Sequence, residues 1–185
     1  MRNRREEINA LVCEMALTDS QAALKSLYLM YFASLLRFTS LYVETTSEAE
    51  EVVSDTFLAI WNNRKTLASI ANFNAYIYTI AQRKAIDSFR QKHMDTFDLS
   101  DQHIDLFACT QTTPEDDLIS KEELERLNRA IDSLPEKCKL VFKLIREDKL
   151  RYKEVAQILN ITVKTVEAHV ATAVKKLRLI IKHEE

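Results

Sequence analysis

The chain has 185 residues, 46% hydrophobic and 29% charged, a balance typical of a soluble globular protein that forms one large or two small domains. It contains no glycine and two prolines, so helices joined by short polar turns are favoured over a sheet with tight hairpins. No apolar run is long enough to span a membrane, and the charged N-terminus is unlike a secretory signal.

The residues that could carry redox or metal chemistry are widely scattered. Cys13, Cys109 and Cys138 match neither a zinc site nor a disulfide framework, so reduced thiols in a cytoplasmic protein are expected. The four histidines fall in no metal or nucleophile spacing, and there is no glycine-rich phosphate loop. We therefore expect no metal, no cofactor, no small-molecule substrate and no enzymatic activity.

Charge divides the chain into three parts. Residues 1–93 carry 11 basic and 10 acidic side chains, residues 94–120 carry none and 7, and residues 121–185 carry 15 and 11. The middle segment also lacks hydrophobic periodicity, which predicts an acidic linker between a first domain, 1–93, and a second, 121–185. The linker is interpreted either as a flexible strap that lies in a basic channel of a partner or as a solvated spacer.

Four helices are predicted in the first domain, at about residues 6–16, 21–42, 46–63 and 73–92, with a polar loop at 64–72. Thr46 and Ser47 give a capping signal for the third, with acidic residues in its first turns. Its inward side is expected to hold Ala49, Val52, Val53, Thr56, Phe57, Ile60 and Trp61. Residues 64–92 carry six basic side chains against Asp87 alone, a surface suited to phosphates.

Residues 151–178 predict a helix-turn-helix. Ala156 is small where two helices must cross, Asn160 stands where the turn needs a left-handed residue, and Thr162 can cap the second helix. The second helix is expected to bury Val163, Val166, Val170, Val174 and Leu177. Its other face is suited to base edges and phosphates, and carries Lys164, Thr165, Glu167, Ala168, His169, Thr172 and Lys175. The alternative is an ordinary helical hairpin with a solvated charged face.

Three motifs in order, EAEEVVSDTFLAIWNNR, NFNAYIYTIAQRKAIDSFRQK and LPEKCKLVFKLIREDKLRYKEVAQILNITVKTVEAHVATAVKKLR, resemble the extracytoplasmic-function (ECF) sigma factors of the sigma-70 family. The resemblance covers about residues 11–179. It implies an all-α protein of two small helical domains that is not an enzyme. It also implies three partners: core RNA polymerase, promoter DNA, and an anti-sigma factor that covers the binding faces.

The resemblance assigns roles to residues of the first domain. Helix 49–64 looks like the family's main polymerase-binding helix, with Glu51, Asp55 and Asn62 as its polar contacts. The loop and helix that follow resemble the minus-10 region, with contacts expected from Lys65, Ser69, Asn72, Asn74, Tyr78, Arg83, Lys84 and Arg90. Tyr78 is expected to face outward and Tyr76 inward. Many relatives have Arg-Asn in place of Gln82-Arg83, so roles at that pair are not carried over.

In the second domain, the outward face of the helix-turn-helix matches the family's minus-35 contacts. Glu167 is suited to accept from cytosine N4, and His169 is suited to reach a guanine or a phosphate. Several relatives have arginine at both places, so the promoter sequence is expected to differ. Helices at about residues 124–145 would meet the flexible flap of the polymerase.

Two other classes of function are alternatives to the sigma factor. A stand-alone DNA-binding regulator would explain residues 151–178 but gives no reason for the basic, aromatic segment 64–92 beside an acidic helix. It would bind promoter DNA tightly without polymerase, whereas a sigma factor co-purifies with core polymerase. An all-helical enzyme lacks the expected residue spacings, and measurable turnover of a nucleotide or ester would be needed to support it.

Overall fold

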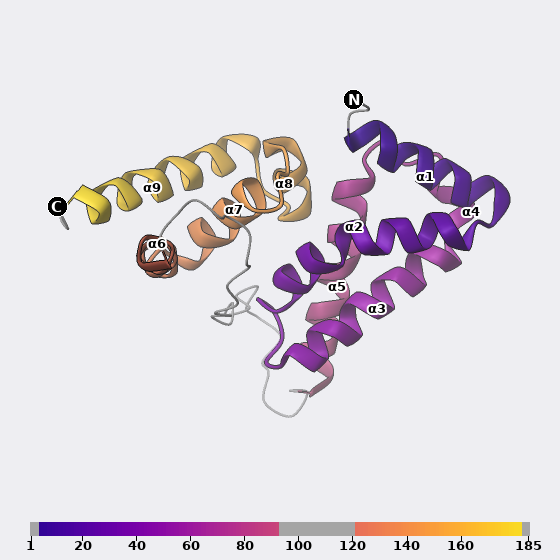
Figure 1. Ribbon diagram of the computed structural model, residues 1–185, viewed down its shortest axis with the longest axis horizontal. Helices are drawn as coiled ribbons and strands as arrows, with labels where there is room; N and C mark the ends of the chain where they lie inside the picture. Colours follow the sequence, from indigo (N-terminus) through magenta and orange to yellow (C-terminus); the bar gives the residue numbers. More distant parts are fainter. Residues whose placement is uncertain (1–3, 93–120, 183–185) are drawn as a thin grey trace. The chain divides into compact units, whose positions relative to one another are not determined.

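The computed structural model describes residues 4–92 and 121–182, and every regular element in these ranges is an α-helix (Figure 1). The chain divides into two compact units, to which these two ranges belong. The expected all-helical class is therefore confirmed for the described residues. The acidic segment 94–120 lies outside them, and the domain boundaries on either side of it stay predictions.

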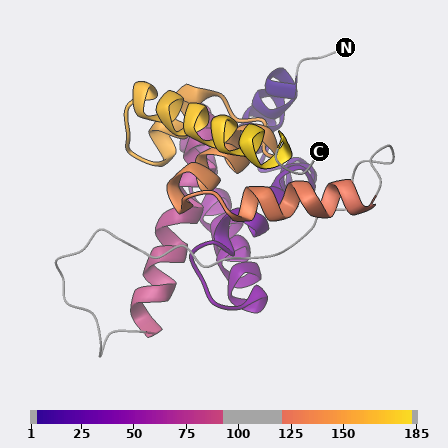
Figure 2. The same cartoon turned by 90° about the vertical axis from the view of Figure 1, so that its left-hand side faces the viewer.

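The described part of the first unit, residues 4–92, contains five helices. The helices are α1 (Arg4–Thr18), α2 (Gln21–Thr39), α3 (Thr46–Asn62), α4 (Arg64–Leu67) and α5 (Phe73–Lys92). α3 packs against α2 and α5, and α1 packs against α2 and α4 (Figures 1 and 2). The predicted loop 64–72 is wrong in its first turn, because α4 forms there and buries Leu67.

The core of this unit is built from the expected inner side of α3 and from aromatic rings. All the predicted inward residues of α3 are buried except Trp61, which is half-buried beneath the Arg64 guanidinium at 4.3 Å. Tyr28 packs on Phe57 with ring centroids 4.9 Å apart. Aromatic pairs at this spacing add to the apolar area they bury, so they fix the position of α3 against α2.

Arg64 joins the start of α4 to the turn between α1 and α2. Its side chain donates to the carboxylate of Asp19 and to the backbone carbonyl of Trp61. Asp19 has a φ of 53°, one of the left-handed positions that this glycine-free chain fills with other residues. Arg64 therefore stabilises the packing of the unit, although it was predicted to be part of the basic surface of residues 64–92.

The start of α3 carries a capping box. Thr45, one residue before the predicted signal, accepts from the backbone N–H of Glu48 at 3.3 Å, and the Glu48 carboxylate accepts from the backbone of Glu44 and Thr45. Lys92, at the end of α5, also donates to this carboxylate. The Lys92 ammonium and these backbone donors hold the pKa of Glu48 below its ordinary value.

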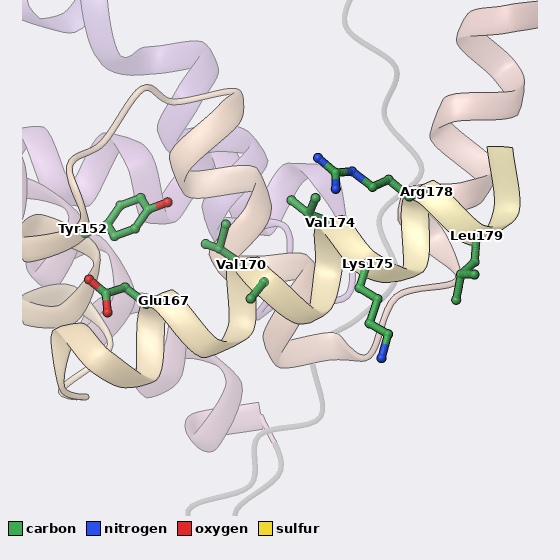
Figure 3. Close-up of a pocket in the computed structure, with 8 residues that line it drawn as sticks. Tyr152, Glu167, Val170, Val174, Lys175, Arg178 and Leu179 are labelled. Atoms are coloured by element: carbon green, nitrogen blue, oxygen red, sulfur yellow. The ribbon is translucent and has the colours of Figure 1, made fainter. Parts of the chain in front are cut away.

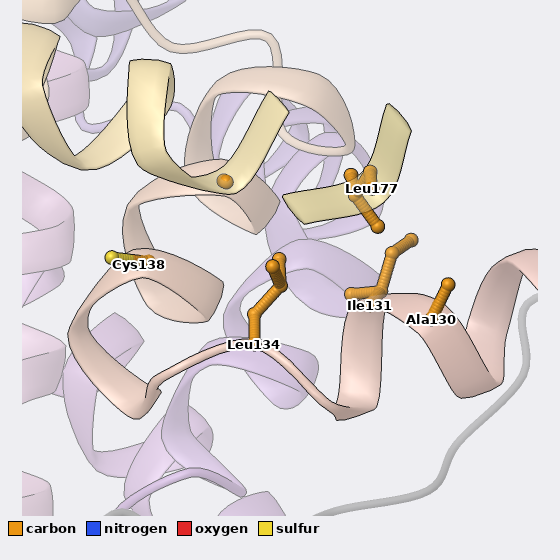
Figure 4. Packing of buried hydrophobic residues seen from close by; sticks show 6 residues of the cluster. Ala130, Ile131, Leu134, Cys138 and Leu177 are labelled. Atoms are coloured by element: carbon orange, nitrogen blue, oxygen red, sulfur yellow. The ribbon is translucent and has the colours of Figure 1, made fainter. Parts of the chain in front are cut away.

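The second unit contains α6 (Lys121–Asp132), α7 (Glu136–Arg146), α8 (Tyr152–Ile158) and α9 (Val163–Lys182). α9 packs against the other three. Between α6, α7 and α9 lies an apolar cluster in which Ile131, Leu134 and Leu177 point toward one another (Figure 4). Because α9 forms one wall of this cluster, its orientation is set by the core of the unit.

Replacing Glu48 by Gln should lower the free energy of unfolding at pH 7 by about 0.5 kcal/mol, since the amide can still accept in the capping box but the negative charge near the helix N-terminus and Lys92 is lost. The pKa of Glu48 is lowered on folding, so this stabilisation is present above the ordinary value of 4.5 and is lost as the pH falls through the folded value. Urea unfolding at pH 7 and pH 3 measures it. Equal differences between wild type and Glu48→Gln at both pH values would contradict this account, and Glu50→Gln on the exposed side of α3 is the control.

Candidate nucleic-acid interface and protein-binding surface

The side of α3 opposite the core presents a continuous exposed stripe. Glu51, Asp55 and Asn62, the predicted polymerase contacts, are all exposed. Leu58 lies between them at helical spacing and is 57% exposed, which sequence reasoning missed. Its place in the series 51, 55, 58, 62 was the available signal, because helical spacing puts this apolar side chain among the predicted polymerase contacts.

Two ion pairs join this helix to α5. Lys84 Nζ lies 3.3 Å from Asp55 Oδ2, and Lys92 pairs with Glu48. The first pair links a predicted polymerase contact to a predicted DNA contact. Both side chains of that pair are partly exposed, so the pair contributes little stability and can exchange partners at small cost.

The predicted minus-10 residues fall into two groups. Four are exposed and available to a ligand: Lys65, Ser69, Arg83 and Arg90. Two of the others have structural partners. The Asn72 side chain accepts from the Ala75 backbone at 3.3 Å and caps α5, while the Asn74 side chain accepts from the Tyr31 hydroxyl.

The predicted orientation of two tyrosines is wrong. Tyr78 is 1% exposed and packs edge-on against Phe38, with ring centroids 5.1 Å apart, so it offers no stacking surface to a base. Tyr76 is only half-buried and lies seven residues before Arg83, on the same face of α5. The buried side of α5 includes residues 78, 81 and 85. The accessible aromatic ring is therefore that of Tyr76, which was expected in the core.

Gln82 has a structural role that explains one departure from the family pattern. Its side-chain nitrogen donates to the Tyr42 hydroxyl at 3.1 Å. Burial raises the pKa of Tyr42 to about 12, so this hydroxyl stays protonated at neutral pH. Gln82 therefore connects α5 to the turn that follows α2, and Arg83 beside it is left exposed.

The helix-turn-helix has the predicted local geometry. Asn160 has a φ of 51°, in the left-handed region, and Thr162 Oγ1 accepts from the backbone N–H of Thr165 at 3.1 Å. At the start of α8, the buried carboxylate of Glu154 accepts from the backbone N–H of Arg151 at 2.7 Å. Both helices of the motif thus begin with a satisfied donor, as the sequence predicted for the second.

The buried side of α9 differs in part from the prediction. Val166 and Leu177 are buried as expected, but Ala173 completes the buried stripe, while Val163, Val170 and Val174 are only half-buried. The last two valines line a shallow groove that Tyr152 of α8 also borders (Figure 3). Other side chains lining the groove are Glu167, Ala171, Lys175, Arg178 and Leu179.

The predicted minus-35 residues occupy adjoining parts of α9. Five are exposed: Lys164, Glu167, Ala168, Thr172 and Lys175. Thr165 is half-buried and shares a hydrogen bond with Thr162 at 2.8 Å. His169 is also half-buried, and its Nδ1 lies 3.4 Å from the buried Sγ of Cys138 on α7, so part of its ring faces inward.

Each of the two units matches a model of a known protein family. The model described as Sigma-70 region 2 matches residues 27–94, and the model described as Sigma-70, region 4 matches residues 124–177. The first covers the exposed stripe of α3 and the basic part of α5, and the second contains the helix-turn-helix. Together these regions define the class of protein as a sigma factor of the sigma-70 type.

Similar proteins show which group of sigma factors the chain resembles. The ferric citrate uptake sigma factor FecI of Escherichia coli K12 is 26% identical over 166 residues, which are 88% of this chain and 92% of FecI. The ECF RNA polymerase sigma factor SigW of Bacillus subtilis 168 is 27% identical over 138 residues, which are 71% and 74% of the two chains. The chain therefore belongs to the ECF sigma factors of the sigma-70 family.

Solved structures share the fold. The structure of CnrH in complex with the cytosolic domain of CnrY gives a TM-score of 0.61 at 20% identity, covering 97% of this chain and 99% of that one. The sigma factor RpoE in complex with the anti-sigma factor NepR from Bartonella quintana gives 0.60 at 19% identity, covering 87% and 98%. Both likenesses support the all-helical fold.

The described residues contain neither a membrane-spanning helix nor a cluster of metal ligands. None of the helices in residues 4–92 and 121–182 is long and apolar enough to cross a membrane. The same part of the chain contains no group of three or more histidine, cysteine or carboxylate side chains placed to hold a metal ion.

The turn residue gives a direct test of the helix-turn-helix. Asn160→Ala should lower the free energy of unfolding of the second unit by about 1 kcal/mol, because a Cβ without a compensating polar group is strained at positive φ. Asn160→Gly should leave the stability unchanged or raise it slightly. Thermal unfolding followed by circular dichroism compares the two variants, and equal stability of Ala and Gly at this position would count against the left-handed turn.

Proposed function

We propose that the chain directs core RNA polymerase to promoters, with α3 as its main polymerase contact, α5 as its minus-10 surface and α9 as its minus-35 reader. The observation that carries this assignment is the exposed stripe of α3 beside the exposed basic residues of α5, within the matched region 2. The chain acts by binding, and its proposed location is the cytoplasm, where polymerase is found.

The stripe on α3 suits a basic, helical partner. Glu51 and Asp55 supply negative charge, and Leu58 supplies an apolar anchor between the charged and amide positions. A leucine that becomes buried between two helices contributes more to affinity than exposed charges at the rim. We therefore add Leu58 to the proposed polymerase contacts Glu51, Asp55 and Asn62.

The proposed minus-10 surface contains fewer of the predicted residues than the sequence alone implied. Arg83 and Arg90 are exposed on the same face of α5 and are suited to phosphates of the opened strand. Lys65 and Ser69, after α3, are exposed near the start of this surface. Tyr76 replaces Tyr78 as the proposed stacking side chain, because stacking needs an accessible ring.

The proposed minus-35 contacts lie in the first four turns of α9. Lys164 and Thr172 are exposed and reach phosphates or acceptor groups of bases. Glu167 accepts from cytosine N4, whereas the exposed methyl group of Ala168 can meet thymine. Thr165, His169 and Lys175 are the other members of the set.

An anti-sigma factor is a further proposed partner. The two solved structures named above hold CnrY and NepR against proteins of this fold, and the exposed stripe of α3 is a surface that such an inhibitor would need to cover. Pull-down from the cells that contain this chain should recover an inhibitory protein. Constitutive transcription with no inhibitory protein recovered would contradict the proposal.

Leu58→Asp should weaken binding to core polymerase at least tenfold, because the apolar anchor of the α3 stripe is replaced by a charge. Leu29→Asp is the matched control, since Leu29 on α2 is also highly exposed but lies off the stripe. Titration of labelled chain with core polymerase measures both. Equal losses for the two variants would show that the position on α3 has no special role.

Lys164→Ala should change the choice among promoters that differ at the minus-35 element, while polymerase binding stays within about twofold of wild type. Lys25→Ala, an exposed lysine on α2, is the control for loss of positive charge. Competition between promoter fragments in single-round transcription measures the choice. Parallel loss of polymerase binding and promoter choice would contradict the division of roles between α3 and α9.

A further inference from the structure

His169 lies at the border between the core side of α9 and the proposed minus-35 surface. It follows Thr165 by four residues and precedes Thr172 by three, so it shares a face with both. It also stands between Val166 and Ala173, which are fully buried. A half-buried imidazole in this place has one edge toward the core and one edge toward the surface.

The edge of the His169 ring that faces the core lies next to a thiol. Nδ1 of His169 lies 3.4 Å from Sγ of Cys138, which is 5% exposed in the first turn of α7. The other members of the Cys138 cluster have no polar side-chain atoms: Ala130, Ile131, Leu134, Ala173 and Leu177. Figure 4 shows Cys138 in this apolar setting. His169 is therefore the side chain with which the thiol can exchange a hydrogen bond inside this cluster.

The direction of that hydrogen bond follows from the chemistry of the two groups. Burial raises the pKa of the Cys138 thiol, so the sulfur carries its proton at neutral pH. A thiol is a weak donor and a thiol sulfur a weak acceptor, whereas an unprotonated imidazole nitrogen is a good acceptor. The favoured arrangement has the thiol donating to Nδ1, which leaves the ring proton of neutral His169 on Nε2.

We propose that Cys138 is a positioning residue that holds His169 in the Nε2–H form, so that the recognition helix presents a hydrogen-bond donor at this edge. Such a donor pairs with acceptors on DNA, which are guanine O6 or N7, adenine N7, thymine O4 or a phosphate oxygen, and is repelled by the amino groups of adenine and cytosine. This proposal deepens the proposed minus-35 role of α9 and rests on it. It assigns to α7 a part in promoter choice without any contact of Cys138 with DNA.

The tautomer can be measured in the intact chain without DNA. Nitrogen-15 NMR of histidine-labelled protein, with His169→Gln to identify the signals, should give His169 protonated on Nε2 and hydrogen-bonded at Nδ1. Cys138→Ala should shift the Nδ1 signal away from its hydrogen-bonded position, and Cys138→Ser should retain it, because a hydroxyl also donates. A wild-type ring protonated on Nδ1, or signals unchanged in Cys138→Ala, would overturn the proposal.

The consequence for promoter choice needs the assembled holoenzyme. Selection of minus-35 sequences from a randomised library should give a loss of about fivefold for His169→Ala, the size of one hydrogen bond. Cys138→Ala should give a smaller change at the same place, because the imidazole of His169 can still donate from Nε2 in one of two tautomers. A loss confined to one base pair identifies a base contact, and a loss uniform over all sequences identifies a phosphate contact. Cys138→Ser should behave as wild type.

Two results would refute this consequence. Equal changes in Cys138→Ala and Cys138→Ser would mean that Cys138 acts through packing alone. A change at a base position that His169→Ala leaves untouched would mean that it acts through another residue. If the wild-type chain fails to form a holoenzyme, the proposed function fails instead, and the NMR measurement still decides the state of His169.

Discussion

The one-sided packing of α3 is the constraint on which the first unit depends. Val53 and Ile60 are completely buried and Phe57 is nearly so, and they hold the helix against α2 and α5. Once that side is fixed, the positions of Glu51 and Leu58 on the outside follow from helix geometry. The proposed polymerase contacts and the proposed DNA contacts then lie on neighbouring helices, which the Lys84–Asp55 pair joins.

In the second unit, a turn and a small residue determine which side of α9 is buried. Asn160 takes the left-handed conformation in place of glycine, and Ala173 has no exposed surface at the centre of the buried stripe of α9. These features fix which side of α9 is inward, and His169 falls at its border. In the proposal above, Cys138 on α7 fixes the tautomer of His169 from the core side of α9.

Periodic patterns predicted most of the fold, because a stripe of apolar residues at helical spacing has one way to be buried. The inner side of α3, the turn at Asn160 and the cap at Thr162 were all visible in the sequence. Tyr76 and Tyr78 were assigned to the wrong sides because both flank the apolar stripe and either ring could join it. Bonds between distant residues, such as Gln82 to Tyr42, depend on helix positions that no local pattern contains.

In the proposed function, this chain gives core polymerase its promoter choice, and its own affinity for DNA depends on polymerase. Transcription in vitro on fragmented genomic DNA, with core polymerase alone and with the chain added, tests it most directly. The account predicts new start sites that appear only with both proteins and share sequence at the minus-35 and minus-10 positions. Unchanged start sites, together with tight promoter binding by the chain alone, would contradict it.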